Sequence, residues 1–202
     1  MIFLKTIVTS TSKTHTTHMS LSSILRFGDP RLENICDQAD FSDPELNQNI
    51  NKLTNALELF QSHYNWGRSI AAPQIGIMKR IVAINSPYLP KLLINPEIIW
   101  HSSETQIIWD DCMSLPEIAV EVERWKSIDV KFQTLDGKTE WLKKLSPEDS
   151  ELLQHEIDHL DGVLMTQRMT DANRVVSREF RASLPIQNPI HLQPFIDSNR
   201  EN

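Results

Sequence analysis

The sequence lacks any apolar run near the roughly 18 residues that a membrane-spanning helix needs. It has only two cysteines, Cys36 and Cys112, too few for a disulfide scaffold, so we expect a reduced compartment and a cytoplasmic location. Basic residues are in deficit, with 20 Lys and Arg against 27 Asp and Glu, whereas nucleic-acid-binding proteins usually present a basic face. We therefore expect a soluble protein without a specific nucleic-acid or membrane partner.

Length and composition indicate one ordinary globular domain. The chain has 202 residues, of which 40% are hydrophobic and 23% charged, and it contains no internal repeats. Residues 1–20 are rich in Ser, Thr and His and contain neither an acid nor an Arg, so we expect a disordered extension rather than a targeting peptide, with Met19 as an alternative start. Three prolines after residue 184 predict an irregular tail over 183–202. The folded domain is then expected at 21–182.

Two stretches have the periodicity of amphipathic helices. In residues 44–63, apolar side chains recur every three or four positions, and Ser42 or Asp43 can cap the start. A second helix is predicted to begin after Ser146, with Pro147 in its first turn, and to end at Gly162.

Short apolar or alternating runs predict strands between and around these helices. They cover residues 81–84, 92–94, 118–122, 128–134 and 139–142, with a hairpin turn at 135–138. A third helix is expected around Arg174, Arg178 and Arg181. The pattern indicates an α+β fold, in which small antiparallel sheets pack around the second helix, with an N-terminal and a C-terminal helix.

The second helix carries the pattern His155-Glu156-Ile157-Asp158-His159. Histidines at positions i and i+4 lie on one face of a helix, so both rings can reach one metal ion, and Glu156 can reach a water beside that metal without ligating it. The alternative is a charged helix whose histidines form ordinary hydrogen bonds. A catalytic metal of this kind usually has a third protein ligand, for which Cys112 is the candidate in a turn-like stretch over 110–116. A buried core thiol is the alternative for Cys112.

Three blocks of sequence, in the same order, resemble those of peptide deformylases. Residues 154–160 match the family's Gln-His-Glu-x-Asp-His-Leu, and residues 110–114 resemble its Glu-Gly-Cys-Leu-Ser. Residues 67–74 resemble its Gly-x-Gly-x-Ala-Ala-x-Gln. The resemblance extends from about residue 25 to about residue 169 and makes the expected domain the catalytic one.

The resemblance implies a hydrolase that removes the formyl group from the N-terminal formyl-methionine of nascent polypeptides and releases formate. Its partners would be N-formyl-methionyl peptides and, transiently, the ribosome. It implies one divalent metal ion, Fe²⁺, for which Zn²⁺, Ni²⁺ or Co²⁺ can substitute. It assigns Cys112, His155 and His159 to the metal, Glu156 to proton transfer, and the Gln74 side chain and the Met113 backbone N–H to the developing oxyanion.

For the substrate, we expect Leu152 and Ile70 to line an apolar slot for the methionine side chain, with Gly67, Arg68 and Ser69 beside the peptide. The alternative for Leu152 and Ile70 is plain core.

Three positions depart from the family blocks. Ser69 replaces a Gly and adds a side chain where the family's peptide lies extended. This side chain is expected to narrow the range of peptides that bind. Asp110 replaces Glu and keeps a carboxylate that can orient a ligand histidine. Asp111 replaces Gly and brings a negative charge to the substrate side of the metal ligand, where it could repel anionic groups.

Two other functions fit parts of the pattern. A metallopeptidase would share the two-histidine helix, although a Cys as third ligand argues against it. A degenerate homologue acting as a binding protein is favoured by Ser69 and Asp111 and disfavoured by Glu156 and Gln74.

Overall fold

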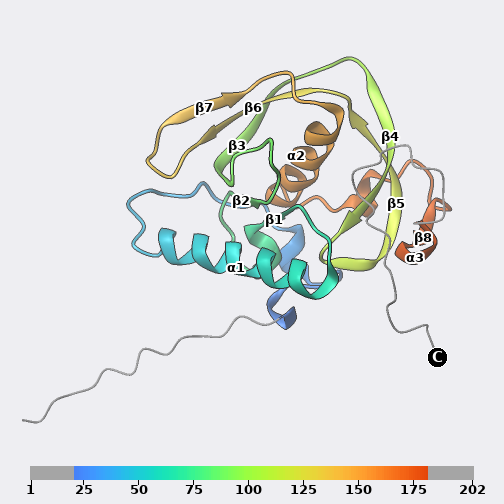
Figure 1. The fold of residues 1–202 in the computed structure, drawn as a ribbon, viewed down its shortest axis with the longest axis horizontal. Helices are drawn as coiled ribbons and strands as arrows, with labels where there is room; N and C mark the ends of the chain where they lie inside the picture. The colour runs from blue at the N-terminus through green and yellow to red at the C-terminus, as the bar shows by residue number, and fades with distance from the viewer. Residues whose placement is uncertain (1–20, 182–202) are drawn as a thin grey trace, which may run out of the picture.

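The computed structural model describes residues 21–181. The extension predicted for residues 1–20 and the tail predicted for 183–202 lie outside this part of the chain. Within it, the fold is α+β with antiparallel sheets around a central helix, as the sequence predicts (Figure 1).

The strands form two sheets in which every pair is antiparallel. The larger has the order β1-β2-β3-β6-β7, with β1 at an edge, and the smaller has the order β4-β5-β8. The five strands of the larger sheet are β1 (Ser69–Ala71), β2 (Ile81–Ile84), β3 (Leu92–His101), β6 (Ile128–Gln133) and β7 (Thr139–Leu142). Those of the smaller sheet are β4 (Thr105–Cys112), β5 (Leu115–Trp125) and β8 (Val175–Ser177).

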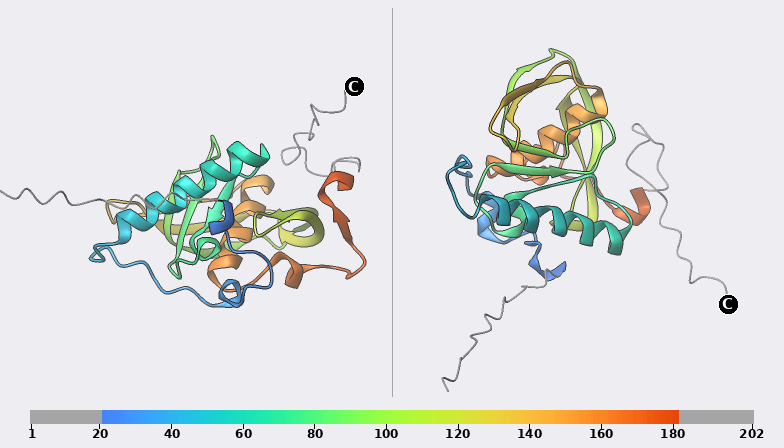
Figure 2. Two further views of the ribbon diagram at one scale, coloured as in Figure 1. Left: turned by 90° about the horizontal axis from the view of Figure 1, so that it is seen from below. Right: turned by 60° about the vertical axis from the view of Figure 1, so that its left-hand side comes forward.

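The helices are α1 (Leu46–Tyr64), α2 (Pro147–Leu160) and the single turn α3 (Arg178–Arg181). Short 3-10 turns cover Leu21–Ser23, Pro30–Glu33, Ala72–Ile75 and Met165–Arg168. Helix α2 contacts strands of both sheets, which curve around it (Figures 1 and 2). None of the helices in the described residues is long and apolar enough to cross a bilayer.

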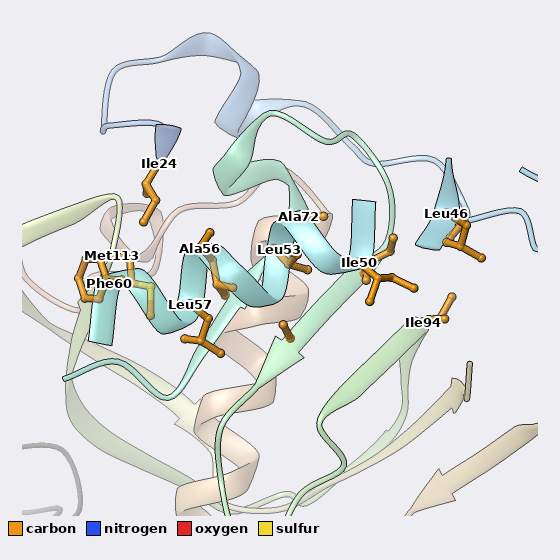
Figure 3. Close-up of a cluster of buried hydrophobic side chains, with 14 residues drawn as sticks. Ile24, Leu46, Ile50, Leu53, Ala56, Leu57, Phe60, Ala72, Ile94 and Met113 are labelled. Carbon is orange, nitrogen blue, oxygen red and sulfur yellow. The ribbon is translucent and has the colours of Figure 1, made fainter. Parts of the chain in front are cut away.

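The side chains that form the core are those that the periodicity selects. Leu53 and Phe60 of α1 point from the helix into one hydrophobic cluster (Figure 3). Ile70 of β1 belongs to the same cluster, and all three residues are at most 1% exposed. A second cluster, which includes Leu153 and Leu160, fills the space between this sheet and α2. The two clusters hold β1 between α1 and α2, so its residues face the two helices alternately.

Three local predictions need correction. The expected third helix is one turn, because residues 175–177 instead pair with β5 as strand β8. Helix α1 begins at Leu46 without a side-chain cap, and Asp43 accepts a hydrogen bond from the backbone of Glu45 just before it. The stretch around Cys112 is not a long turn: Cys112 ends β4, and β5 starts at Leu115 after a two-residue turn.

Candidate active site

Two side chains of α2 and the end of β4 meet at one point inside the molecule. Ser146 accepts a hydrogen bond from the Asp149 N–H and caps α2. Within this helix His155 and His159 are four positions apart and therefore lie on one face. Sγ of Cys112 lies 3.2 Å from Nε2 of His159. One ligand atom from each of Cys112, His155 and His159 lies within 4.8 Å of the other two, and all three residues are buried.

The donor set fits a divalent transition metal. A thiolate with two imidazoles suits zinc or ferrous iron, and three protein ligands leave a coordination position open. Burial holds the pKa of His159 well below its usual range, which favours the neutral imidazole that a metal requires. The cluster therefore has the composition and spacing of a mononuclear catalytic metal site.

Asp110 orients one of the ligands. Its Oδ1 lies 2.9 Å from Nδ1 of His155, and its Oδ2 accepts a hydrogen bond of 2.8 Å from Arg124. Arg124 also forms an ion pair with Asp158. The carboxylate that contacts His155 is therefore held in place by a buried network of charges. Burial by itself would raise the pKa of Asp110, but His155 and Arg124 hold it well below its usual range. The ionised carboxylate thereby directs Nε2 of His155 toward the metal position.

Glu156 lies beside the cluster and is 3% exposed. Its Oε1 accepts a hydrogen bond of 2.7 Å from Ser69, and its buried Oε2 has no hydrogen-bond partner among residues 21–181. Burial raises the pKa of Glu156 above its usual range, while His155 and the Ser69 hydroxyl oppose that shift. The side chain of Ser69 is thus turned to the glutamate.

Gln74 is fixed beside the thiol of Cys112. Its Oε1 accepts a hydrogen bond of 2.8 Å from the Ala71 N–H, while its Nε2 lies 3.5 Å from Cys112 Sγ and 3.3 Å from Ser114 Oγ. The Ser114 N–H also points to Cys112 Sγ, at 3.4 Å. Two N–H donors are thus directed at one sulfur.

A cavity of about 300 Å³ opens at these groups. Most of the residues predicted for catalysis and substrate contact line it, together with the predicted metal ligand His155: Gly67, Arg68, Ser69, Gln74, Asp111, Met113, Leu152 and Glu156. Ile70 does not, because it is fully buried in the core against α1, so its assignment to the methionine slot is corrected. Gly67 has φ +105°, a backbone conformation that other residues adopt only with strain, which favours glycine at this point of the cavity wall.

The charge of Asp111 is balanced in a way that the sequence did not reveal. Its Oδ2 accepts a hydrogen bond of 3.2 Å from Arg178, whose guanidinium carbon lies 3.7 Å from the centre of the Trp66 ring. Asp111 and Trp66 both line the cavity. Repulsion of anionic groups by Asp111 is therefore weaker than expected from the sequence.

Glu151 also lines the cavity, although none of the sequence motifs pointed to it. It lies four positions before His155 on α2, so the spacing rule that pairs the two histidines could have identified it. It forms an ion pair of 2.5 Å with Arg68 across the cavity wall.

An α+β domain with a Cys–His–His donor set and a buried glutamate at one cavity defines a metal-dependent hydrolase. A family model described as "Polypeptide deformylase" matches residues 21–175. The chain therefore belongs to the polypeptide deformylase family, whose members remove the formyl group from the N-terminus of nascent polypeptides, and it is a hydrolase of this kind. This membership decides against the metallopeptidase alternative.

Individual relatives agree with the family match. A peptide deformylase of Thermotoga neapolitana is 36% identical over 154 residues, which cover 76% of this chain and 90% of the relative. The crystal structure of a peptide deformylase from Synechococcus elongatus in complex with actinonin is 26% identical, covers 85% of this chain and 89% of its own, and has a TM-score of 0.69. A Met-Ala-Ser-bound deformylase of Acinetobacter baumannii is 28% identical over 72% of this chain and 96% of its own, with a TM-score of 0.62.

Proposed function

We propose that the chain hydrolyses N-formyl-methionyl peptides in the cavity beside Cys112, His155 and His159. The observation that carries this proposal is the carboxylate of Glu156, which is buried beside the donor set with Oε2 unpartnered among residues 21–181. A buried acceptor without a partner is costly in a fold, so its persistence at a cavity favours a role with a bound water or substrate.

We propose Fe²⁺ as the working metal, with Zn²⁺, Ni²⁺ or Co²⁺ as substitutes, held by the thiolate and the two imidazoles. When bound, such an ion polarises a carbonyl oxygen and lowers the pKa of a water toward neutrality. The mixed sulfur and nitrogen donors and the resemblance of the three sequence blocks support this assignment.

Glu156 is the proton-transfer group in this proposal. Its Oε2 takes a proton from the attacking water, and the resulting acid returns that proton to the leaving amine. Ser69 holds the other oxygen of the carboxylate at 2.7 Å and so fixes its orientation.

Gln74 and Met113 stabilise the developing oxyanion. Gln74 is preorganised because the Ala71 N–H holds its amide oxygen, which leaves its NH₂ group directed to the thiol side of the cavity. The Met113 backbone N–H follows Cys112 directly in the turn after β4. One such donor contributes about 2.7–4 kcal/mol in another hydrolase.

The substrate peptide extends the free edge of β1. The Asn85 N–H donates a hydrogen bond to the Arg68 C=O just beyond the paired ends of β1 and β2, so the backbone groups of Ser69, the next residue, point to the open edge. Leu152 contributes an apolar contact at the cavity wall. We place this activity in a catalytic domain at 21–182, in the cytoplasm, with transient contact to the ribosome where nascent chains emerge.

The test is formate release from formyl-Met-Ala-Ser by protein purified without oxygen, with metal content measured by elemental analysis. We expect turnover with about one equivalent of iron. Cleavage of internal peptide bonds in an unformylated peptide should be absent. Full metal occupancy without formate release would contradict the proposed activity and support a degenerate binding protein.

Asp110→Asn tests the support of the ligand histidine. The amide oxygen of Asn can still accept from His155 Nδ1, but the negative charge that polarises this ligand is lost, so metal affinity should fall by about 10- to 100-fold. Affinity is measured by titration against a competing chelator. Asp158→Asn is the matched control, because it removes a partner of the same Arg124 but leaves the contact between Asp110 and His155. An equal loss in both variants would mean that Arg124, not the histidine contact, determines the effect.

A further inference from the structure

The wall of the cavity next to Leu152 is charged rather than apolar. Nη2 of Arg68 lies 2.5 Å from Oε1 of Glu151, and the two side chains are only 20% and 4% exposed. Arg68 directly precedes β1, and Glu151 lies in the first half of α2, so the ion pair joins the two elements that border the site. Both residues and Leu152 line the same cavity as Glu156.

A side chain that fills this part of the cavity displaces water from the ion pair. An aliphatic side chain offers no hydrogen bond in return, so burying the guanidinium and carboxylate against it is unfavourable. A side chain of similar length that ends in an acceptor can bind the guanidinium N–H groups in place of water. Methionine lies between these cases, because its thioether sulfur is a weak acceptor.

We propose that the Arg68–Glu151 ion pair determines which first side chain the site accepts, and that it selects formyl peptides whose first side chain ends in a hydrogen-bond acceptor. This inference rests on the proposed function, since it takes the first side chain of the formyl peptide to lie in this cavity. Leu152 packs against the stem of that side chain, and the ion pair contacts its tip. Glu151 compensates the charge of Arg68, so the preferred tip is polar and neutral.

The first test compares four formyl peptides that differ only in their first residue: norleucine, methionine, glutamine and glutamate. For the unmodified protein we expect kcat/KM for glutamine to exceed that for norleucine, its aliphatic counterpart. In the double variant Arg68→Leu/Glu151→Leu, the norleucine-to-glutamine ratio should rise at least about tenfold, which corresponds to about 1.4 kcal/mol. An unchanged ratio in this variant would overturn the proposal.

A second variant tests the ion pair without placing two leucines in the cavity wall. Glu151→Gln keeps the size of the side chain and leaves Arg68 with a net positive charge, so the glutamate-to-glutamine ratio should rise about tenfold or more. The double variant Glu97→Leu/Lys131→Leu is the matched control, because it removes an ion pair of 2.7 Å between exposed side chains on β3 and β6, away from the cavity. If either ratio of kcat/KM values rose in this control as much as in the corresponding variant of Arg68 and Glu151, the proposal would also be overturned.

Binding of the deformylated peptides gives a readout that does not require turnover. Their dissociation constants are measured by calorimetry on the metal-loaded protein. They should rank the first residues in the same order as the kcat/KM values do, and the variants should shift both quantities in the same direction. If no formyl peptide releases formate, the proposed function fails, whereas this binding series still decides the role of the ion pair. Tighter binding of the norleucine peptide than of the glutamine peptide to the unmodified protein would overturn it.

Discussion

Glu156→Gln is expected to lower the rate of formate release by at least about 10²-fold and up to about 10⁴-fold, the range typical of general acid–base catalysis. The amide keeps the size of the carboxylate and can still accept the hydrogen bond from Ser69, but it cannot take a proton from water. Metal content should stay near that of the unmodified protein, because Cys112, His155 and His159 remain. Single-turnover rates and elemental analysis of the same sample measure the two quantities.

Two results would contradict this assignment in different ways. Loss of the metal in Glu156→Gln would mean that the carboxylate is itself a ligand. A near-normal rate with the metal bound would mean that another group transfers the proton. Glu140→Gln is the matched control, because Glu140 is exposed on β7 and lies outside the cavity lining. It should change neither the rate nor the metal content.

The surroundings of Glu156 also explain why a loss of rate can be separated from a loss of metal. Its Oε1 is held by Ser69, its Oε2 has no hydrogen-bond partner among residues 21–181, and the residue lines the cavity, whereas the three candidate metal-binding atoms form a cluster without it. A residue that followed a ligand in sequence but pointed into the solvent could not serve in this way. The side chain of Ser69, which departs from the family's glycine, therefore supports the orientation of the glutamate instead of only narrowing the cleft.

The parts of the site that the sequence predicts are those set by local geometry. Helix α2 follows from its cap at Ser146 and its apolar face, and the spacing of His155 and His159 on one turn follows from helix periodicity alone. The strands at 81–84, 128–133 and 139–142 were also identifiable, because they are short apolar or alternating runs next to turn residues.

The errors concern positions that tertiary packing decides. Ile70 lies in a three-residue strand between two helices, and successive side chains of a strand point to opposite faces. Because Ser69 faces Glu156 on α2, Ile70 must face α1, and its hydrophobic character could not reveal which helix it would meet. Strand β4 was missed because residues 105–112 combine apolar and acidic side chains without a strict alternation and end in an irregular pairing at Cys112.

The ion pairs between residues far apart in the chain could likewise not be predicted from the sequence. Arg178 reaches Asp111 across 67 positions of sequence, and Arg68 reaches Glu151 across 83. Neither pair follows from spacing, because only the packing of β8 on β5 and of β1 near α2 brings the partners together. These contacts change the expected cavity from an apolar slot into one with a charged wall.

The second large effect is expected for Cys112→Ala, which should weaken metal binding by more than about 100-fold. The loss should exceed the 10- to 100-fold effect of removing a group that only orients a ligand, because the thiolate is one of three direct donors. Formate release should fall with the metal content. Elemental analysis after dialysis against a weak chelator, together with a competition titration, measures the affinity.

Cys36→Ala is the matched control for this variant. Cys36 is also a buried free cysteine, but burial raises the pKa of its thiol to about 11, so it stays protonated and is unsuited to bind a metal at neutral pH. We expect unchanged metal content and activity in this control. Thermal unfolding adds a readout that does not depend on turnover: added metal should raise the midpoint of the unmodified protein and of Cys36→Ala, but hardly that of Cys112→Ala, since a ligand stabilises only the state that binds it. Full metal retention in Cys112→Ala would mean that the thiol is a core side chain and that a different third donor completes the site.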